Sequence, residues 1–258
     1  MTDKKILWIN PIGSNEFDTE MEHYLARYKD ERTRISVISF EDGPANLEYY
    51  SYSIPIAKDL MTAVNDAELN GFDAAIIGCF YDPFLDEMRE VSSIVISGPA
   101  ESAMKIATSL GSRFSIIVGR KKWIPKMSEN VQKYGYEKFL SSFKSIDMGV
   151  QDFQTMKEET EKRILRSAKE AVDLDGAESI VLGCTAEFGF YKKVQEEIGV
   201  PVVDAVIAPL KFAEFMVDLK NVSGLKHSKI GKYASPPFNE AEDWLGLKLN
   251  YTENKKGI

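Results

Sequence analysis

The sequence predicts an α/β fold of two pseudo-symmetric lobes, each a parallel-type sheet flanked by helices. Two observations support this prediction. Short apolar runs rich in β-branched residues alternate with longer amphipathic stretches, a pattern typical of strands that helices cover on both faces. A segment is also duplicated, because residues 71–79 align without a gap on residues 176–184, and each copy ends in Gly-Cys. The duplication is what predicts two similar lobes.

The expected elements alternate along most of the chain. The expected strands are Ile6–Ile9, Arg34–Ser39, Ala74–Gly78, Ile94–Ile96, Phe114–Val118, Ser142–Ile146, Ser179–Gly183 and Pro201–Val203. The expected helices lie near 15–29, 55–69, 83–90, 99–110, 123–134, 153–174, 187–198 and 205–218. Asp82-Pro83 predicts a helix start, with Asp82 as the cap and proline at the first helical position.

The duplication also suggests where the chain divides. We expect residues 1–97 to form the first lobe, residues 98–204 the second, and residues 205–258 to return to the first. From Ser223 the composition changes, so we expect a tail that is extended over a lobe or a neighbouring subunit and frayed at its end. Functional loops of strand–helix units lie at the carboxyl ends of the strands, which places the expected active site in the cleft between the lobes.

Composition and charge exclude several classes of protein. The 258 residues are 44% hydrophobic and 28% charged, with a formal net charge of -8. This negative balance argues against nucleic-acid binding. No apolar stretch approaches the roughly 20 residues of a membrane helix, and the residues before the first strand are too short for a signal sequence. We expect a cytoplasmic protein that binds a small molecule and no membrane.

Cys79 and Cys184, the only cysteines, end the two copies of the duplicated segment. In a reducing compartment we expect them to be reduced thiols that take part in chemistry rather than a structural disulfide. Each follows a buried strand and precedes a predicted helix, whose N-terminal N–H groups would lower the thiol pKa. One thiolate could then accept a carbon-bound proton while the other thiol donates one. The alternative is that both are small core residues.

A metal site is not expected, because His23 and His227 lack ligand spacing and are both predicted to lie on the surface. Asn10, which ends the first strand, is expected either to contact the substrate or to hold its own turn. The backbone N–H groups of Phe80 and Thr185 are candidate oxyanion donors, although Thr185 could instead cap the next helix.

Several segments, taken in order, resemble the hydantoin racemase family of the aspartate/glutamate racemase superfamily. They are Ile9–Pro11, Glu41–Ala45, Gly78–Pro83, Pro99–Ala103 and Val181–Cys184. The resemblance implies a cofactor-independent racemase of a cyclic ureide, allantoin or a 5-substituted hydantoin, in which Cys79 and Cys184 are the two bases. It also implies that Gly43, Pro44, Gly119 and Ala186 lie near the substrate.

Two departures from the superfamily pattern leave alternatives open. Its amino-acid racemases carry an acid where this chain has Asn10 and a histidine where it has Ala186-Glu187. The absence of this acid and this histidine fits a hydantoin substrate, whose stereogenic carbon is more acidic than the α-carbon of a free amino acid. The chain also has Arg120 in a loop that in hydantoin racemases usually contains threonine, and that side chain could face an anionic or ureido group, or solvent. The alternatives are an amino-acid racemase, a cis–trans isomerase, a decarboxylase or a non-catalytic ligand-binding sensor. We also expect a homo-oligomer, with the aromatic run 49–52 as a lid or a subunit contact.

Overall fold

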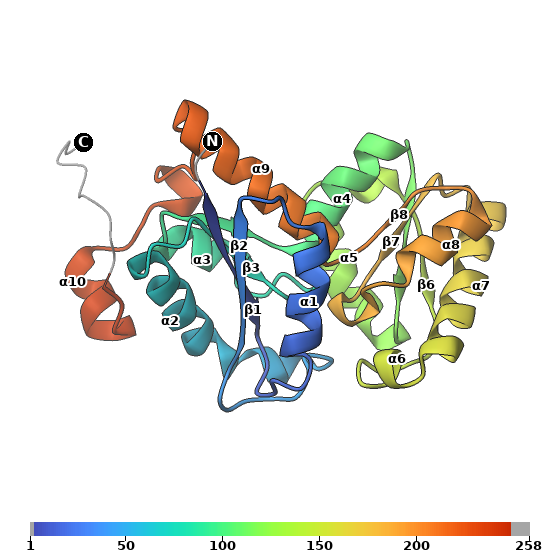
Figure 1. The fold of residues 1–258 in the computed structure, drawn as a ribbon, viewed down its shortest axis with the longest axis horizontal. Coiled ribbons are helices and arrows are strands. Elements are labelled where there is room, and N and C mark those ends of the chain that lie inside the picture. The colour runs from blue at the N-terminus through green and yellow to red at the C-terminus, as the bar shows by residue number, and fades with distance from the viewer. Residues whose placement is uncertain (1–2, 249–258) are drawn as a thin grey trace.

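The computed structural model describes residues 3–248, and it consists of two four-stranded sheets with helices on both faces (Figure 1). The strand orders are β2-β1-β3-β4 and β6-β5-β7-β8, so the second sheet repeats the connectivity of the first. All strand pairs in both sheets are parallel. The expected two-lobe α/β class is confirmed, and all the expected strands are present.

The strands are β1 (Lys4–Asn10), β2 (Thr33–Ser39), β3 (Ala74–Ile77), β4 (Val95–Ser97), β5 (Phe114–Val118), β6 (Leu140–Ser145), β7 (Ser179–Leu182) and β8 (Val202–Val203). The helices are α1 (Asp18–Tyr28), α2 (Ile56–Leu69), α3 (Leu85–Val91), α4 (Pro99–Leu110), α5 (Ile124–Lys133), α6 (Asp152–Thr155), α7 (Lys157–Asp175), α8 (Tyr191–Ile198), α9 (Ile207–Ser223) and α10 (Phe238–Glu240). Short helical turns are η1 (Tyr50–Ser53), η2 (Lys121–Trp123), η3 (Glu137–Phe139), η4 (Thr185–Glu187), η5 (Gly231–Tyr233) and η6 (Ala241–Leu245).

The first sheet is buried on both faces because its strands alternate apolar side chains between two helix layers. Ile6 and Trp8 of β1 pack with α1 and α9, whereas Leu7 and Ile9 pack with α2 and α3. Successive side chains of a strand point to opposite faces, so a continuous apolar run fills both layers. This rigid sheet fixes the direction of the loops that follow its strands.

Two helices connect the lobes in opposite directions. Helix α4 follows β4 of the first sheet but packs against β7 and β8 of the second. Helix α9 follows β8 and packs against β1, β3 and β4 of the first sheet, and α4 and α9 contact each other (Figure 1). The two crossovers bring the loops after β3 and β7 toward each other.

The expected cap at Asp82-Pro83 was wrong. Asp82 and Phe84 adopt positive φ angles of 48° and 56°, and α3 begins only at Leu85. A residue before proline is pushed out of the α region, so the chain turns before the helix starts. The Asp82 carboxylate instead accepts the N–H groups of Ala100 at 3.0 Å and Glu101 at 2.9 Å, and therefore caps α4.

The other helix predictions differ mainly at the ends. The segment near 153–174 is interrupted at Met156 between α6 and α7, and α9 continues to Ser223, five residues beyond its expected end at 218. The helix expected near 187–198 begins only at Tyr191, because the residues after Cys184 form the turn η4. In this third case a loop that lines the cavity replaces the first turn of the expected helix.

The tail from Gly224 lies along the first lobe, but the expectation of an extended tail was wrong in part, because the tail contains η5, α10 and η6. The Lys229 ammonium donates to the carbonyls of Arg89, Glu90 and Ser92 at 2.6–2.8 Å. His227 Nε2 accepts the backbone N–H of Ile96 at 3.0 Å, on the edge strand β4. His227 is therefore not a surface residue, and burial lowers its pKa to about 4. The expected fraying at the end falls on residues 249–258, which lie outside the described part of the chain.

Candidate active site

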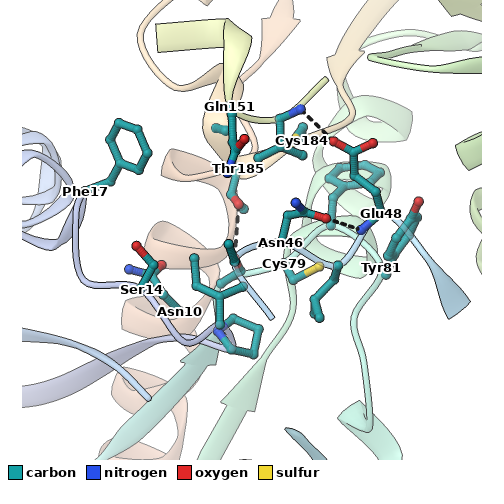
Figure 2. Close-up of a pocket in the computed structure, with 18 of the residues that line it drawn as sticks. Asn10, Ser14, Phe17, Asn46, Glu48, Cys79, Tyr81, Gln151, Cys184 and Thr185 are labelled. Atoms are coloured by element: carbon teal, nitrogen blue, oxygen red, sulfur yellow. Dashed lines mark hydrogen bonds between the residues drawn. The ribbon is translucent and has the colours of Figure 1, made fainter. Parts of the chain in front are cut away.

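A cavity of about 180 Å³ lies between the lobes at the carboxyl ends of their strands (Figure 2). Loops after β1, β2, β3 and β7 contribute to its walls, together with side chains from α1, α5 and α6. Parallel sheets with right-handed crossovers place such loops at one edge, where ligands of α/β proteins bind. The duplicated Gly-Cys segments end in this cavity.

Both cysteines line the cavity, and each is partly accessible although it lies deep in the molecule. The ionised form of Cys79 raises the pKa of Cys184, so the two thiols are close enough to interact electrostatically. Tyr81 interacts with both of them, because burial and then the charges of Cys79 and Cys184 raise its pKa. The structure thus brings the two copies of the segment to one site.

The expected effect of a helix N-terminus on the thiols was wrong. Burial raises the pKa of Cys79 to about 12 and that of Cys184 well above its ordinary value. The α-helices that follow the two cysteines, α3 and α8, begin only at Leu85 and Tyr191. Each thiol instead receives a backbone N–H from two residues further on, Tyr81 for Cys79 and Ala186 for Cys184, and this contact lowers its pKa in part. Matched turns, rather than helix ends, supply the polar contacts of the sulfurs.

A buried carboxyl group lies behind Cys184. Glu187 is fully buried, and neither of its carboxyl oxygens makes a regular hydrogen bond within the described residues. Burial raises its pKa well above the usual range, although the N–H groups of Cys184 and Gly183 lower it in part. A charge on Glu187 raises the pKa of Cys184 further, so this residue acts on the thiol instead of being solvated.

Four further residues singled out in the sequence line the cavity: Asn10, Phe80, Thr185 and Ala186. The Asn10 amide is held by two neighbours, since it accepts the Trp8 indole N–H at 2.6 Å and donates to Asp18 at 2.6 Å. The Thr185 hydroxyl donates to the Gly78 carbonyl at 3.0 Å and so links the two copies of the segment (Figure 2).

Gly43, Pro44 and Gly119 do not line the cavity. The Pro44 carbonyl accepts the N–H of Gly13 at 3.0 Å, so this turn supports the β1 loop from outside. The Gly119 carbonyl accepts the N–H of Met148 at 3.0 Å. A Cβ on Gly119 would lie 2.4 Å from the Trp123 ring, which explains glycine there as close packing.

Glu48 is a lining residue that the sequence analysis missed. Its side chain is buried, one oxygen accepts the Val150 N–H at 2.9 Å, and the other lies 3.0 Å from the Arg120 guanidinium. Arg120 itself is outside the cavity and pairs with this carboxylate. The sequence holds no signal for it, since Glu48 lies between Leu47 and Tyr49 in a segment without strand or helix periodicity.

Other missed lining residues give the cavity its apolar character. Phe17 and Met21 line it from the first lobe, and Trp123, Met127 and Phe188 come from the second. The charged lining residues are Glu16 and Glu48; no lysine, arginine or histidine of the described residues lines it. The cavity thus offers apolar surface and hydrogen-bond groups but no cation for an anionic ligand.

Within residues 3–248, no cluster of three or more histidine, cysteine or acidic side chains could hold a metal ion. None of the helices in that range is long and apolar enough to span a membrane. The aromatic run at 49–52 lies at the lobe boundary, where the Lys122 ammonium sits 5.0 Å from the Tyr49 ring centroid and 5.8 Å from that of Tyr50.

The sequence matches the model of the Asp/Glu/hydantoin racemase family over residues 6–213, so the chain belongs to this family. Membership makes it an isomerase of the racemase type and confirms the resemblance found in its motifs. A hydantoin racemase of Pseudomonas sp. (strain NS671) is 33% identical over 251 residues, covering 97% of this chain and 98% of that protein. A hydantoin racemase of Paenarthrobacter aurescens is 34% identical over 233 residues, covering 90% and 97%. The solved structure of an allantoin racemase from Klebsiella pneumoniae has a TM-score of 0.82 at 27% identity, covering 91% of this chain and 94% of that one.

Proposed function

We propose that this protein racemises a 5-substituted hydantoin by proton transfer between Cys79, the substrate carbon and Cys184. The observation that carries the proposal is that one thiol from each copy of the duplicated segment lines the same cavity. A racemase that uses two bases needs one on each face of the stereogenic carbon. Two cysteines in pseudo-symmetric positions suit that requirement, and general acid–base catalysis by such groups contributes about 10²- to 10⁴-fold each.

The charge of the cavity supports a neutral cyclic substrate. A free amino acid brings a carboxylate, which proteins usually bind with arginine, lysine or a set of N–H donors. The described lining has no cationic side chain and carries the acids Glu16 and Glu48. A neutral ring does not need a cation, and its carbon acid is easier to ionise because the adjacent ring carbonyl stabilises the enolate.

The apolar walls support an apolar substituent at carbon 5. Phe17, Met21 and Phe188 give the lining apolar surface, and the Gln154 amide beside them already donates to the carbonyls of Ala186 and Phe188. Burying a polar group without a hydrogen bond costs about 1–3 kcal/mol. We therefore expect aromatic or branched aliphatic hydantoins to react faster than allantoin, by about 10- to 100-fold in kcat/KM.

In the proposed reaction one thiolate removes the proton at carbon 5 and the opposite thiol returns a proton to the other face. The charge that develops on the ring carbonyl oxygen is stabilised by the backbone N–H groups of Phe80 and Thr185, with Asn10 and Ala186 in contact with the ring. Gly43, Pro44 and Gly119 act as supports of the cavity walls. Because either thiol can act as base while the other acts as acid, the same site can convert each enantiomer into the other.

Polarimetry with single enantiomers of 5-benzylhydantoin, 5-isobutylhydantoin and allantoin, repeated in deuterated water, tests this function. The expected result is loss of rotation with deuterium appearing at carbon 5. Cys79→Ser and Cys184→Ser should each lose racemisation by about 10²-fold or more while remaining folded. Retained racemisation in either variant would contradict the two-thiol mechanism. Inertness on the whole panel would contradict the proposed substrate class.

A further inference from the structure

We propose that Glu48 binds the substrate, with its carboxylate accepting a hydrogen bond from the ring N–H at position 1 and so fixing how the ring lies between the thiols. This inference rests on the proposed function, because it assigns a role toward the same cyclic ureide. Nothing in the two-thiol reaction itself requires a carboxylate at this place.

The burial of Glu48 is the first observation. Its side chain is 6% exposed, although it belongs to a loop that crosses from the first lobe toward the second. Its Oε1 atom is occupied by the N–H of Val150 at 2.9 Å. Its Oε2 atom is buried and lies 3.0 Å from the Arg120 guanidinium, yet makes no hydrogen bond of regular geometry within the described residues. A carboxylate offers about four acceptor positions, so this oxygen retains capacity for a donor.

The position of the carboxylate is the second observation. Figure 2 places it beside Cys184 and Tyr81 at the upper right of the cavity. Its charge acts on both residues, since it contributes to raising the pKa of Tyr81 and of Cys184. Glu16, the other acid of the described lining, is exposed. Glu187 is also buried near Cys184 but does not line the cavity, so among the described lining residues Glu48 is the buried carboxylate.

The chemistry of the ring selects the partner. A hydantoin carries N–H donors at positions 1 and 3 and carbonyl acceptors at positions 2 and 4. Backbone N–H groups beside the cysteines suit the carbonyl at position 4, where the enolate charge develops. A carboxylate repels carbonyl oxygens and accepts an N–H instead. Position 1 is bonded to carbon 5, between the thiols, so its N–H is the donor that lies nearest to Glu48.

Two non-reacting rings isolate this hydrogen bond. In 5,5-dimethylhydantoin carbon 5 has no proton, and 2,2-dimethylsuccinimide differs only by a methylene group in place of the N–H at position 1. Both are neutral near pH 7, and their dissociation constants can be measured by calorimetry. The variant is Glu48→Gln, which keeps the size and removes the charge, and the matched control is Arg120→Gln, which keeps the carboxylate and removes its partner.

The wild-type protein should bind the hydantoin about 10- to 100-fold more tightly than the succinimide, as expected for a hydrogen bond to a charged group. This ratio should fall at least fivefold in Glu48→Gln and stay near the wild-type value in Arg120→Gln. An unchanged ratio in Glu48→Gln, in a protein that racemises hydantoins, overturns the role of Glu48 alone. A wild-type protein that neither racemises hydantoins nor binds either ring overturns the proposed function together with this inference.

Discussion

At the scale of single residues, the two cysteines are matched in position but not in surroundings. Asp82, three residues after Cys79, accepts hydrogen bonds from Ala100, Glu101 and the Tyr134 hydroxyl at 2.9–3.0 Å. Glu187, three residues after Cys184, makes no regular hydrogen bond within the described residues. The two thiols thus occupy matching places in the duplicated segments, whereas the acids behind them differ in their contacts.

The single-cysteine variants should separate the two faces of the substrate. In deuterated water, Cys79→Ser should exchange the carbon-5 proton of one enantiomer without inverting it, because the remaining thiol reaches one face only. Cys184→Ser should do the same for the opposite enantiomer. Nuclear magnetic resonance measures the exchange, and chiral chromatography measures inversion in the same samples. Exchange of both enantiomers by one variant would mean that a second base reaches the other face.

The raised thiol pKa values predict slow alkylation at neutral pH. The pKa of Cys79 is raised to about 12 and that of Cys184 is also raised, so both thiols of the free protein are protonated near pH 7. At pH values below the pKa, the fraction of reactive thiolate then grows about tenfold for each rise of one pH unit. Labelling by iodoacetamide, followed by mass spectrometry, should rise in this way between pH 6 and 9 without a plateau. A plateau near pH 7 would show that the turns around the cysteines outweigh burial.

At the scale of elements, the strands were predictable and the loops were not. Each strand is a local apolar run, and β1 with its alternating Ile6, Leu7, Trp8 and Ile9 indicates two buried faces in its own sequence. The start of α3 depended on a contact with another element, because Asp82 caps the N-terminus of α4 and not that of α3. Long-range pairing of this kind leaves no local pattern.

The residues of the candidate site also separate into those that the sequence could predict and those that it could not. Cys79 and Cys184 could be found because the duplicated segments mark them, and the residues next to them follow from chain continuity. Glu48 and Gln154 could not. Glu48 enters the cavity from a long loop without a regular pattern, and Gln154 lies in a predicted helix that the structure interrupts at Met156. Gly119 was expected near the substrate from the family resemblance alone, but it lies outside the cavity and packs closely against the Trp123 ring.

The tail should give the protein a stability that depends on pH. The folded-state pKa of His227 is about 4, below its ordinary value of 6.5. The folded protein resists protonation there, so this contribution to stability is present above pH 6.5 and is lost as pH falls toward 4. A difference of one between the folded-state and unfolded-state pKa corresponds to about 1.4 kcal/mol of stability.

Urea unfolding at pH 7, 5.5 and 4.5 measures this effect against His227→Gln, which keeps an acceptor for Ile96 but does not titrate. The wild-type protein should lose free energy of unfolding relative to the variant as pH falls. His23→Gln, a change at an exposed histidine, is the control and should follow the wild-type protein. Parallel curves for His227→Gln and wild type would mean that the tail contact does not control stability.

At the scale of the whole molecule, the exchange of α4 and α9 between the sheets makes the two lobes one interlocked unit. We propose to divide the chain at these crossovers, with residues 1–97 and 205–258 in the first lobe and 98–204 in the second. Helices α4 and α9 join the lobes on one side of the molecule. A homo-oligomer stays a prediction, which size-exclusion chromatography with light scattering would measure.

Across the cavity, the lobes are joined by side chains of the loop between β2 and α2. Glu48 binds the Val150 N–H, and the Lys122 and Lys126 ammonium groups lie 5.0–5.8 Å from the rings of Tyr49 and Tyr50. Glu48 and Val150 line the cavity, whereas these two tyrosines and two lysines lie outside it and hold the loop in place beside it. We expect substrate entry to displace this loop, and contacts that hold the loop in place should then help to retain a bound ligand.

Lys122→Gln should therefore weaken substrate retention more than it affects the chemical step. A cation over an aromatic ring contributes about 0.5–2 kcal/mol, which corresponds to an increase in KM of about 2- to 30-fold. The value of kcat should change less than KM, because the thiols keep their positions once the cavity is closed. Steady-state racemisation kinetics measure both values, with Lys121→Gln as the matched control, since Lys121 is the exposed neighbour of Lys122 on η2. An equal fall of kcat with unchanged KM would mean instead that Lys122 supports the catalytic geometry, and the loop would then be a fixed wall.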